Sequence, residues 1–144
     1  MEESLNQKIK KAFAIENVDI RTYSPLTLAY IGDGIFDLVI RTAVVGRGNT
    51  SANQLHQKTS HIVKAHSQAL MAEALADCLT QEEADVYRRG RNAKSHTMAK
   101  NATVSDYRSA TGFEALMGYL YLTDQTERLI TLVTLAIEQC DFVV

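Results

Sequence analysis

A long apolar stretch, from Pro25 to Val45, has the spacing of one amphipathic helix. Ser24 suits an N-cap, and Pro25 suits the first helical position. Asp33 interrupts the apolar stretch with a carboxylate, on a narrow polar stripe formed by Tyr30, Asp33, Asp37 and Arg41. Because a buried, unpaired carboxylate is costly, Asp33 must be solvated, paired or bound to a cation. We therefore expect something polar to lie against this helix.

The other patterned segments also have helical periodicity. Capping-box spacing begins at Ser51 and at Thr80, and Ser105 suits another N-cap. The pattern predicts helices over residues 3–13, 25–45, 80–90 and 106–122, two more within 51–79 that separate near Thr59 and Ser60, and a last one opened by residues 124–127. Residues 91–104 are predicted to form a long loop. No segment alternates with period two for long enough to indicate a strand, so we predict an all-α fold.

Composition narrows the class of protein. The chain has 144 residues, 46% of them apolar, which is enough for a single globular domain. Cys78 and Cys140 lie far apart, with no spacing typical of a zinc site or a disulfide framework. The N-terminus has no secretion signal and the chain has no apolar run that could span a membrane, so we expect a cytoplasmic protein with no membrane partner.

The charges are distributed unevenly, although the net charge is only -2. Six bases and a single acid, Asp106, lie between Val86 and Arg108. Clustered bases of this kind contact the phosphates of nucleic acids, and the candidates near the predicted loop are Arg88, Arg89, Arg91, Lys94 and Lys100. Asn92 is a candidate donor to a ribose hydroxyl or a base edge. The alternative is a solvated helix end with no ligand.

Glu114 is a second carboxylate inside an apolar helical segment, Thr111 to Gly118. Two carboxylates on two packed helices, with glycines nearby, suggest a site for a hard cation. Mg²⁺ in particular binds to one or two carboxylates, keeps several waters and is completed by phosphates of the substrate. Asp33 and Glu114 are therefore the candidate metal ligands.

A simpler alternative is that each acid pairs with a base. Asp37 is placed to pair with Arg41 at i,i+4, and Glu114 with Arg108 or Lys100. Three glycines lie in these helical segments, where glycine is unfavourable: Gly32, Gly34 and Gly118. They indicate that a backbone, a partner chain or a ligand approaches closely. The spacing of the histidines does not place them on one helical face, so we do not predict a metal site from His56, His61 and His66.

Two short motifs, taken together, resemble a known family. Ile31-Gly32-Asp33 and the run from Phe113 to Leu120 are similar to the two acidic motifs of ribonuclease III. The block from Arg88 to Lys94 and the overall spacing resemble its bacterial branch Mini-ribonuclease III, which consists of the catalytic domain alone. The resemblance extends from about Leu26 to Ile137. It implies an N-terminal amphipathic extension over residues 1–22 and a ribonuclease III-like catalytic domain over 23–144.

The resemblance also implies a function. A homodimer would cleave both strands of double-stranded RNA, leaving 5′-phosphate and 3′-hydroxyl ends. Asp33 and Glu114 would be catalytic and would bind Mg²⁺, while RNA would contact Arg88, Arg89, Arg91, Asn92, Lys94 and Lys100. The implied substrate is the precursor of large-subunit (23S) ribosomal RNA, with a ribosomal protein as helper. The dimer contact would include Gly32, Gly34, Ile35 and Phe36.

The chain departs from full-length ribonuclease III at two acidic positions, where it has Ala29 and Thr111. This thinner acidic cluster leaves open a non-catalytic RNA-binding or ribosome-associated protein with a ribonuclease III fold. A small metal phosphohydrolase acting on nucleotides is a third candidate, and it lacks an obvious base-recognition motif. Retention of two isolated carboxylates in apolar helices favours the nuclease, because such groups are costly without a role.

Overall fold

A computed structural model describes residues 2–94 and 103–144 of the chain. Within those residues it is built of α-helices and short 3₁₀ turns and has no strand, which confirms the all-α prediction. The elements are α1 (Leu5–Ala12), η1 (Ile20–Thr22), α2 (Pro25–Arg47), α3 (Ala52–Val63), α4 (Ala65–Leu75), η2 (Ala76–Cys78), α5 (Gln81–Asn92), α6 (Val104–Leu122) and α7 (Thr126–Gln139). None of these helices is long and apolar enough to cross a membrane.

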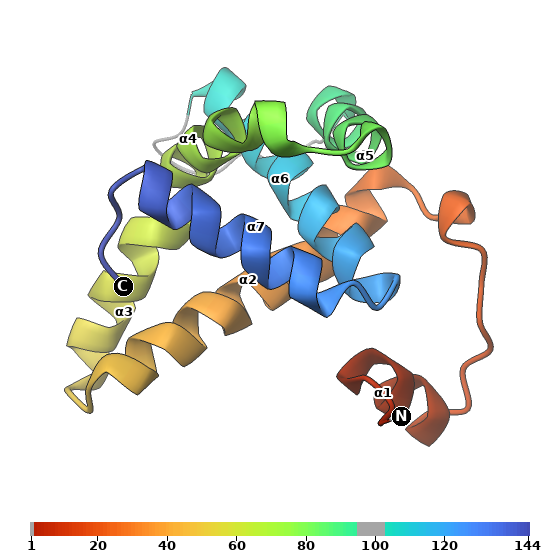
Figure 1. The fold of residues 1–144 in the computed structure, drawn as a ribbon, viewed down its shortest axis with the longest axis horizontal. Coiled ribbons are helices and arrows are strands. Elements are labelled where there is room, and N and C mark those ends of the chain that lie inside the picture. The colour runs from red at the N-terminus through yellow and green to blue at the C-terminus, as the bar shows by residue number, and fades with distance from the viewer. Residues whose placement is uncertain (1, 95–102) are drawn as a thin grey trace.

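Helix α6 forms the centre of the molecule, and α2, α4, α5 and α7 pack around it (Figure 1). The apolar side chains in its middle, such as Phe113, Leu116, Met117 and Leu120, are fully buried, because they face neighbours on several sides. Phe113 of α6 meets Phe36 of α2 edge to face, with ring centroids 5.0 Å apart. This aromatic pair lies in the main hydrophobic core, so α2 and α6 are the helices whose packing fixes the rest.

The crossing of α2 and α6 depends on two glycines. A β-carbon on Gly32 would lie 2.7 Å from the backbone nitrogen of Gly118 and closer still to the carbonyl oxygen of Glu114. A β-carbon on Gly118 would similarly collide with the carbonyl of Leu28. The two backbones are therefore in direct contact, which confirms the expected close approach at Gly32 and Gly118. Gly34 is different, since among the described residues no atom beyond its chain neighbours and its own helix backbone lies within 4 Å of the place where its β-carbon would be.

Helix α5 is held against α6 in the same way. A β-carbon on Gly90 would lie 2.9 Å from the α-carbon of Gly112 and 2.8 Å from the side chain of Ala115. A β-carbon on Gly112 would lie 2.7 Å from the carbonyl oxygen of Tyr87. The last turn of α5 therefore packs directly on the turn of α6 that carries Glu114.

Buried polar bonds also fix the start of α5. Thr80 and Glu83 form the predicted capping box, in which each side chain accepts from the other's backbone N–H. Arg128 of α7 donates to both carboxylate oxygens of Glu83, at 2.8 and 2.9 Å, and holds the pKa of that carboxyl below its usual value. This bidentate pair ties α5 to α7, and nothing in the sequence pattern had indicated Arg128.

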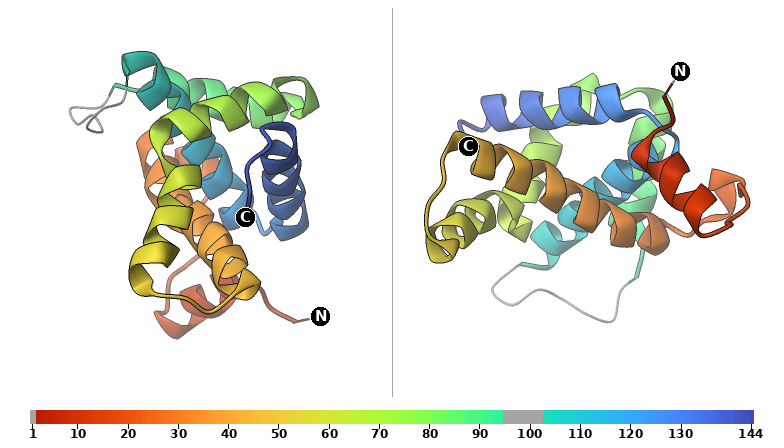
Figure 2. Two further views of the ribbon diagram at one scale, coloured as in Figure 1. Left: turned by 90° about the vertical axis from the view of Figure 1, so that its left-hand side faces the viewer. Right: turned by 90° about the horizontal axis from the view of Figure 1, so that it is seen from below.

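Helix α1 stands apart from the other helices in Figure 1, whereas in the two views of Figure 2 it overlaps them in projection. Asp124, at the turn between α6 and α7, accepts hydrogen bonds from Ser4 Oγ at 2.6 Å and Gln7 Nε2 at 3.0 Å. The large apolar side chains of this helix and its C-cap are exposed: Leu5, Ile9 and Phe13. The predicted amphipathic helix exists, whereas the division at residue 22 stays a prediction.

Several predicted helix boundaries are wrong. The break between α3 and α4 lies at Lys64, with an extended backbone, and not at Thr59 and Ser60. Ser67 and Gln68 of α4 explain this position, because their side chains donate to the last carbonyls of α3. Helix α5 continues to Asn92, and α6 begins at Val104 with Thr103 as its N-cap in place of Ser105. Most of the predicted loop, residues 95–102, lies outside the described residues.

We predict that Gly32→Ala lowers the free energy of unfolding by about 2–4 kcal/mol, because the added carbon must push two backbones apart. The matched control is Gly46→Ala, on the same helix and with no described atom beyond its own helix within 4 Å of the added carbon. It should stabilise the protein by about 0.5–1 kcal/mol through helix propensity. Urea unfolding of both variants measures the difference, and equal effects would contradict a backbone contact at Gly32.

Candidate active site

The structure brings Asp33 and Glu114 together at the crossing of α2 and α6. Gly32 lies against the backbone of Glu114, so the next residue, Asp33, projects beside the Glu114 side chain. The carboxyl of Glu114 lies within hydrogen-bonding reach of the Asp33 carboxylate. Asp33 is exposed to solvent, whereas Glu114 is only partly exposed. The two acids predicted from separate motifs therefore form a single site with one open and one enclosed side.

The surroundings of Glu114 raise its pKa to about 8. Burial is the largest cause, because it disfavours the charged form, and the neighbouring charge of Asp33 acts in the same direction. A hydrogen bond from Gln68 opposes the shift. In the protein alone Glu114 therefore tends to keep its proton near neutral pH. A divalent cation would take the place of that proton and relieve the repulsion between the carboxylates.

Gln68 of α4 is the third side chain of this site. It is 3% exposed, and its Nε2 donates to the carbonyl oxygen of Val63 at 2.7 Å and to Glu114 Oε2 at 3.4 Å. Within the described part of the chain its own Oε1 is buried and accepts no hydrogen bond. Sequence analysis missed Gln68, because a glutamine in a helical segment of mixed composition gives no signal by spacing.

The alternative that each acid pairs with a base is confirmed for Asp37 and is not supported for Glu114. Asp37 pairs with Arg41 at 2.6 Å on the outside of α2. Arg108, one of the bases proposed for Glu114, forms no ion pair with it among the residues described, and the other, Lys100, lies outside them. The neighbours that the structure assigns to Glu114 are Asp33 and Gln68. Its carboxylate thus remains available to a cation.

The two departures from the full-length family pattern have structural roles here. Ala29 is buried in a small cluster against α6, and Thr111 donates its hydroxyl to the carbonyl of Tyr107 at 3.0 Å. In residues 2–94 and 103–144 no group of three or more acids, histidines or cysteines could hold a metal ion. Two oxygen-donor carboxylates fit Mg²⁺, which keeps its waters and takes further ligands from phosphate.

The basic residues gather at the end of α5. Five predicted RNA contacts are exposed there, and they are Arg88, Arg89, Arg91, Asn92 and Lys94. Arg88 also reaches Asp85 at 3.2 Å, which is a weak surface pair. Gly90 packs this turn on α6 against Ala115, the residue that follows Glu114. Lys100 lies outside the described residues.

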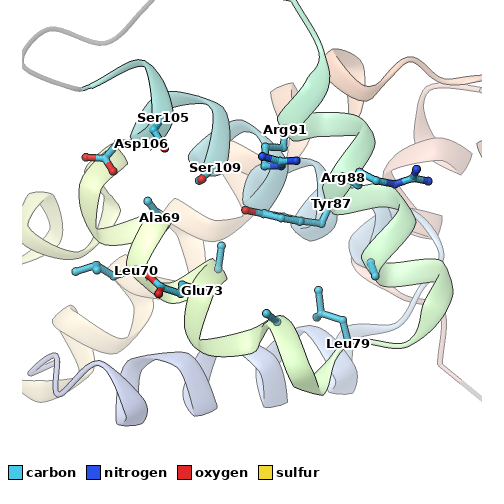
Figure 3. A pocket seen from close by; sticks show the side chains of 13 residues that line it. Ala69, Leu70, Glu73, Leu79, Tyr87, Arg88, Arg91, Ser105, Asp106 and Ser109 are labelled. Atoms are coloured by element: carbon cyan, nitrogen blue, oxygen red, sulfur yellow. The ribbon is translucent and has the colours of Figure 1, made fainter.

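A groove of about 580 Å³ lies between α4, α5 and the start of α6 (Figure 3). Arg88 and Arg91 line one wall, and Glu73 and Asp106 line the other. Neither Asp33 nor Glu114 lines it. The groove therefore has mixed charge and is separate from the carboxylate pair.

Two of the described histidines, His61 and His66, have neighbours of their own. His66 contacts Asp106, with Nδ1 2.9 Å from the carboxylate, and joins the starts of α4 and α6. His61 lies edge-on to Phe142, with ring centroids 5.6 Å apart. Both contacts agree with the interpretation of these residues as packing or surface groups.

Comparisons with known proteins match the sequence of this chain and its arrangement of helices. The family model of the Ribonuclease III domain matches residues 26–125. Mini-ribonuclease 3 of Enterococcus faecalis is 50% identical over 123 residues, which cover 84% of this chain and 93% of that protein. Mini-ribonuclease 3 of Thermoanaerobacter sp. is 43% identical over 138 residues, 96% and 97% of the two chains. A crystal structure of a Fusobacterium nucleatum protein, 30% identical, has a TM-score of 0.77 and covers 85% of this chain and 99% of its own.

The chain belongs to the ribonuclease III family and, within it, to the Mini-ribonuclease 3 group. Its activity is that of an endoribonuclease, which disfavours the alternative of a binding protein without chemistry. The ribonuclease III family acts on double-stranded RNA, generally uses a divalent metal ion and typically works as dimers. The class expected from the two short motifs is thereby confirmed.

We predict that Glu114→Gln stabilises the protein at alkaline pH. In the wild type, the folded chain keeps a proton on Glu114 up to about pH 8, whereas the unfolded chain releases it near pH 4.5. The free energy of unfolding of the wild type therefore falls as the pH rises from about 4.5 to about 8. The variant lacks this fall and should exceed the wild type by about 1–3 kcal/mol at about pH 9, and match it at about pH 4.

Urea unfolding across this pH range measures the effect. Glu138→Gln makes the same chemical change at an exposed position on α7 and is the control. A stability difference that does not depend on pH would contradict an enclosed carboxyl at position 114.

Proposed function

We propose that this protein is a Mg²⁺-dependent endoribonuclease that hydrolyses phosphodiester bonds of double-stranded RNA at Asp33 and Glu114. One observation carries the proposal, the contact of two carboxylates from different motifs with no base between them among the described residues. Like charges at such short range are unfavourable unless a proton or a cation lies between them. The basic end of α5, packed beside the same turn of α6, supplies a surface for the RNA backbone.

The two carboxylates would hold the ion, with Asp33 on the side open to RNA and Glu114 on the enclosed side. When bound, Mg²⁺ neutralises charge on the scissile phosphate and assists activation of a water molecule. In the hydrolysis the water oxygen bonds to phosphorus and the bond to the 3′ oxygen breaks, leaving a 5′-phosphate and a 3′-hydroxyl. Glu114 must lose its proton before it can hold the ion, so binding of Mg²⁺ should release a proton and should weaken as the pH falls.

We propose further that the substrate is a stem of the precursor of large-subunit (23S) ribosomal RNA. The protein would process this stem in the cytoplasm during ribosome biogenesis, with a ribosomal protein as helper. Clustered bases that contact phosphates do not read sequence, so a helper or the shape of the RNA would select the stem. The relatives named above support the family activity, and the choice of stem rests on the resemblance alone.

The protein is proposed to act as a homodimer with two sites. Helix α2 exposes Tyr30, Leu38 and Val45, and Gly34 lies between the first two with open space beside it. An exposed apolar stripe of this kind fits a contact with a second copy of the chain. Gly32 and Phe36, expected in the same contact, are instead buried within the chain against α6. That part of the prediction is wrong, because both residues serve the crossing of the two helices.

We predict that Asp33→Asn lowers the rate of cleavage of an RNA stem in Mg²⁺ by about 10³-fold or more, because one of the two ligand carboxylates is lost. Binding of the same stem should remain, since the basic end of α5 is unchanged. The control is Asp37→Asn, one turn along α2, where the side chain pairs with Arg41. Single-turnover cleavage and filter binding measure both effects, and undiminished cutting by Asp33→Asn would remove this assignment.

We predict that Arg91→Ala weakens RNA binding and reduces the slope of log affinity against log salt by about 0.9, the loss of one phosphate contact. Cleavage at saturating RNA should change little. Lys11→Ala removes an exposed base from α1, which stands apart from α5 in Figure 1, and should leave the salt slope unaltered. Equal slopes for the wild type and Arg91→Ala would show that this arginine does not contact phosphate.

A further inference from the structure

We propose that Gln68 is a positioning residue, whose amide orients the carboxylate of Glu114 toward the divalent ion. The inference rests on the proposed function of the Asp33 and Glu114 pair. Gln68 lies on α4, outside both acidic motifs, and its side chain reaches across to α6. It thereby connects a third helix to a site that sequence analysis had assigned to two.

The amide group has two donors, and both are used. One N–H donates to the carbonyl oxygen of Val63 at 2.7 Å, at the end of α3, and the other faces Glu114 Oε2 at 3.4 Å. The first bond is short and anchors the side chain, so the second donor is held in a fixed direction. Because Gln68 is 3% exposed, water does not compete for these donors. The Glu114 carboxylate is thus constrained at one oxygen while it meets Asp33.

A neutral amide suits this role better than a base. A lysine or arginine at this place would pair with Glu114 and compete with a cation for its charge. An amide fixes the direction of the carboxylate without cancelling its charge, as the partners of metal ligands commonly do. The chain also has Ala29 and Thr111 where full-length relatives of the family carry acids, so the orientation of each remaining acid matters more.

Packing and capping alone do not account for a glutamine here. Gln68 Oε1 is buried and accepts no hydrogen bond within the described residues, which costs stability. The neighbouring Ser67 caps α3 more simply, since its hydroxyl donates to the carbonyl of His61 at 2.6 Å and leaves no such atom. A residue chosen only to end α3 would not need to reach Glu114. The unpaired oxygen is therefore a cost that the contact with Glu114 explains.

The experiment compares Gln68→Met, Ser67→Ala and Asp33→Asn with the wild type, all as the full chain. Methionine fills a similar volume without hydrogen bonds. Three quantities are measured: the Mg²⁺ concentration for half-maximal cleavage of an RNA stem, the binding of Mn²⁺ followed by electron paramagnetic resonance without RNA, and the melting temperature without metal. Gln68→Asn, which keeps the amide but shortens its reach, is a second variant if Gln68→Met does not fold.

We expect Gln68→Met to need about tenfold more Mg²⁺ and to bind Mn²⁺ correspondingly less tightly. Its melting temperature should fall modestly, because the carbonyl of Val63 loses its donor, and removal of the unpaired buried oxygen offsets part of this loss. Ser67→Ala should also melt lower, without any change in the Mg²⁺ requirement. The weaker binding of Mg²⁺ and Mn²⁺ in Gln68→Met alone supports a positioning role for Gln68 over a capping role.

The contrary outcomes are distinct from failure of the proposed function. If Gln68→Met melts lower but keeps the wild-type Mg²⁺ requirement and Mn²⁺ affinity, Gln68 is only a cap and the inference is overturned. In that case a loss of cleavage in Asp33→Asn would still support the proposed nuclease site. If Asp33→Asn cleaves as well as the wild type, the site itself is wrong, and the inference falls with it.

Discussion

The contact between the backbones of α2 and α6 is the constraint on which the rest of the structure depends. Gly32 and Gly118 allow the two helices to touch with no side chain between them. The residue after Gly32 is Asp33, and the carbonyl that Gly32 meets belongs to Glu114, so the same crossing that closes the core also sets the distance between the two acids. Packing and chemistry cannot be separated here. A change that moves the helices apart would weaken the core and separate the carboxylates together.

This geometry makes the charged form of Glu114 unfavourable. Burial and a neighbouring acid both disfavour the charged form of Glu114, and Gln68 offers only a neutral hydrogen bond against them. In the protein alone, Glu114 avoids this cost by keeping its proton. A divalent ion between the two carboxylates would neutralise their charges more completely. The basic end of α5 is packed on the turn of α6 that carries Glu114 through Gly90 and Gly112, and in the proposed function it supplies the surface for the RNA backbone.

The sequence was most predictive where a residue stood out against its surroundings. Asp33 and Glu114 were recognisable because carboxylates are rare in apolar helical runs, and the caps at Ser24 and Thr80 followed from local chemistry. Contacts between distant segments were not predictable. Gln68 and Arg128 act through partners on other helices, and the break at Lys64 is set by side chains that reach back from α4. The glycines indicated a close approach, but only the structure shows that Gly32 meets α6 while Gly34 faces open space.

The most direct test of this account is a crystal structure of the protein with an RNA stem and Ca²⁺, an ion that occupies oxygen sites of the same kind. The account predicts ion density bridged by the carboxylates of Asp33 and Glu114, next to a backbone phosphate, with the amide of Gln68 still on Glu114. Ion density at another place, or the two carboxylates turned apart toward separate lysine or arginine side chains, would contradict the central claim.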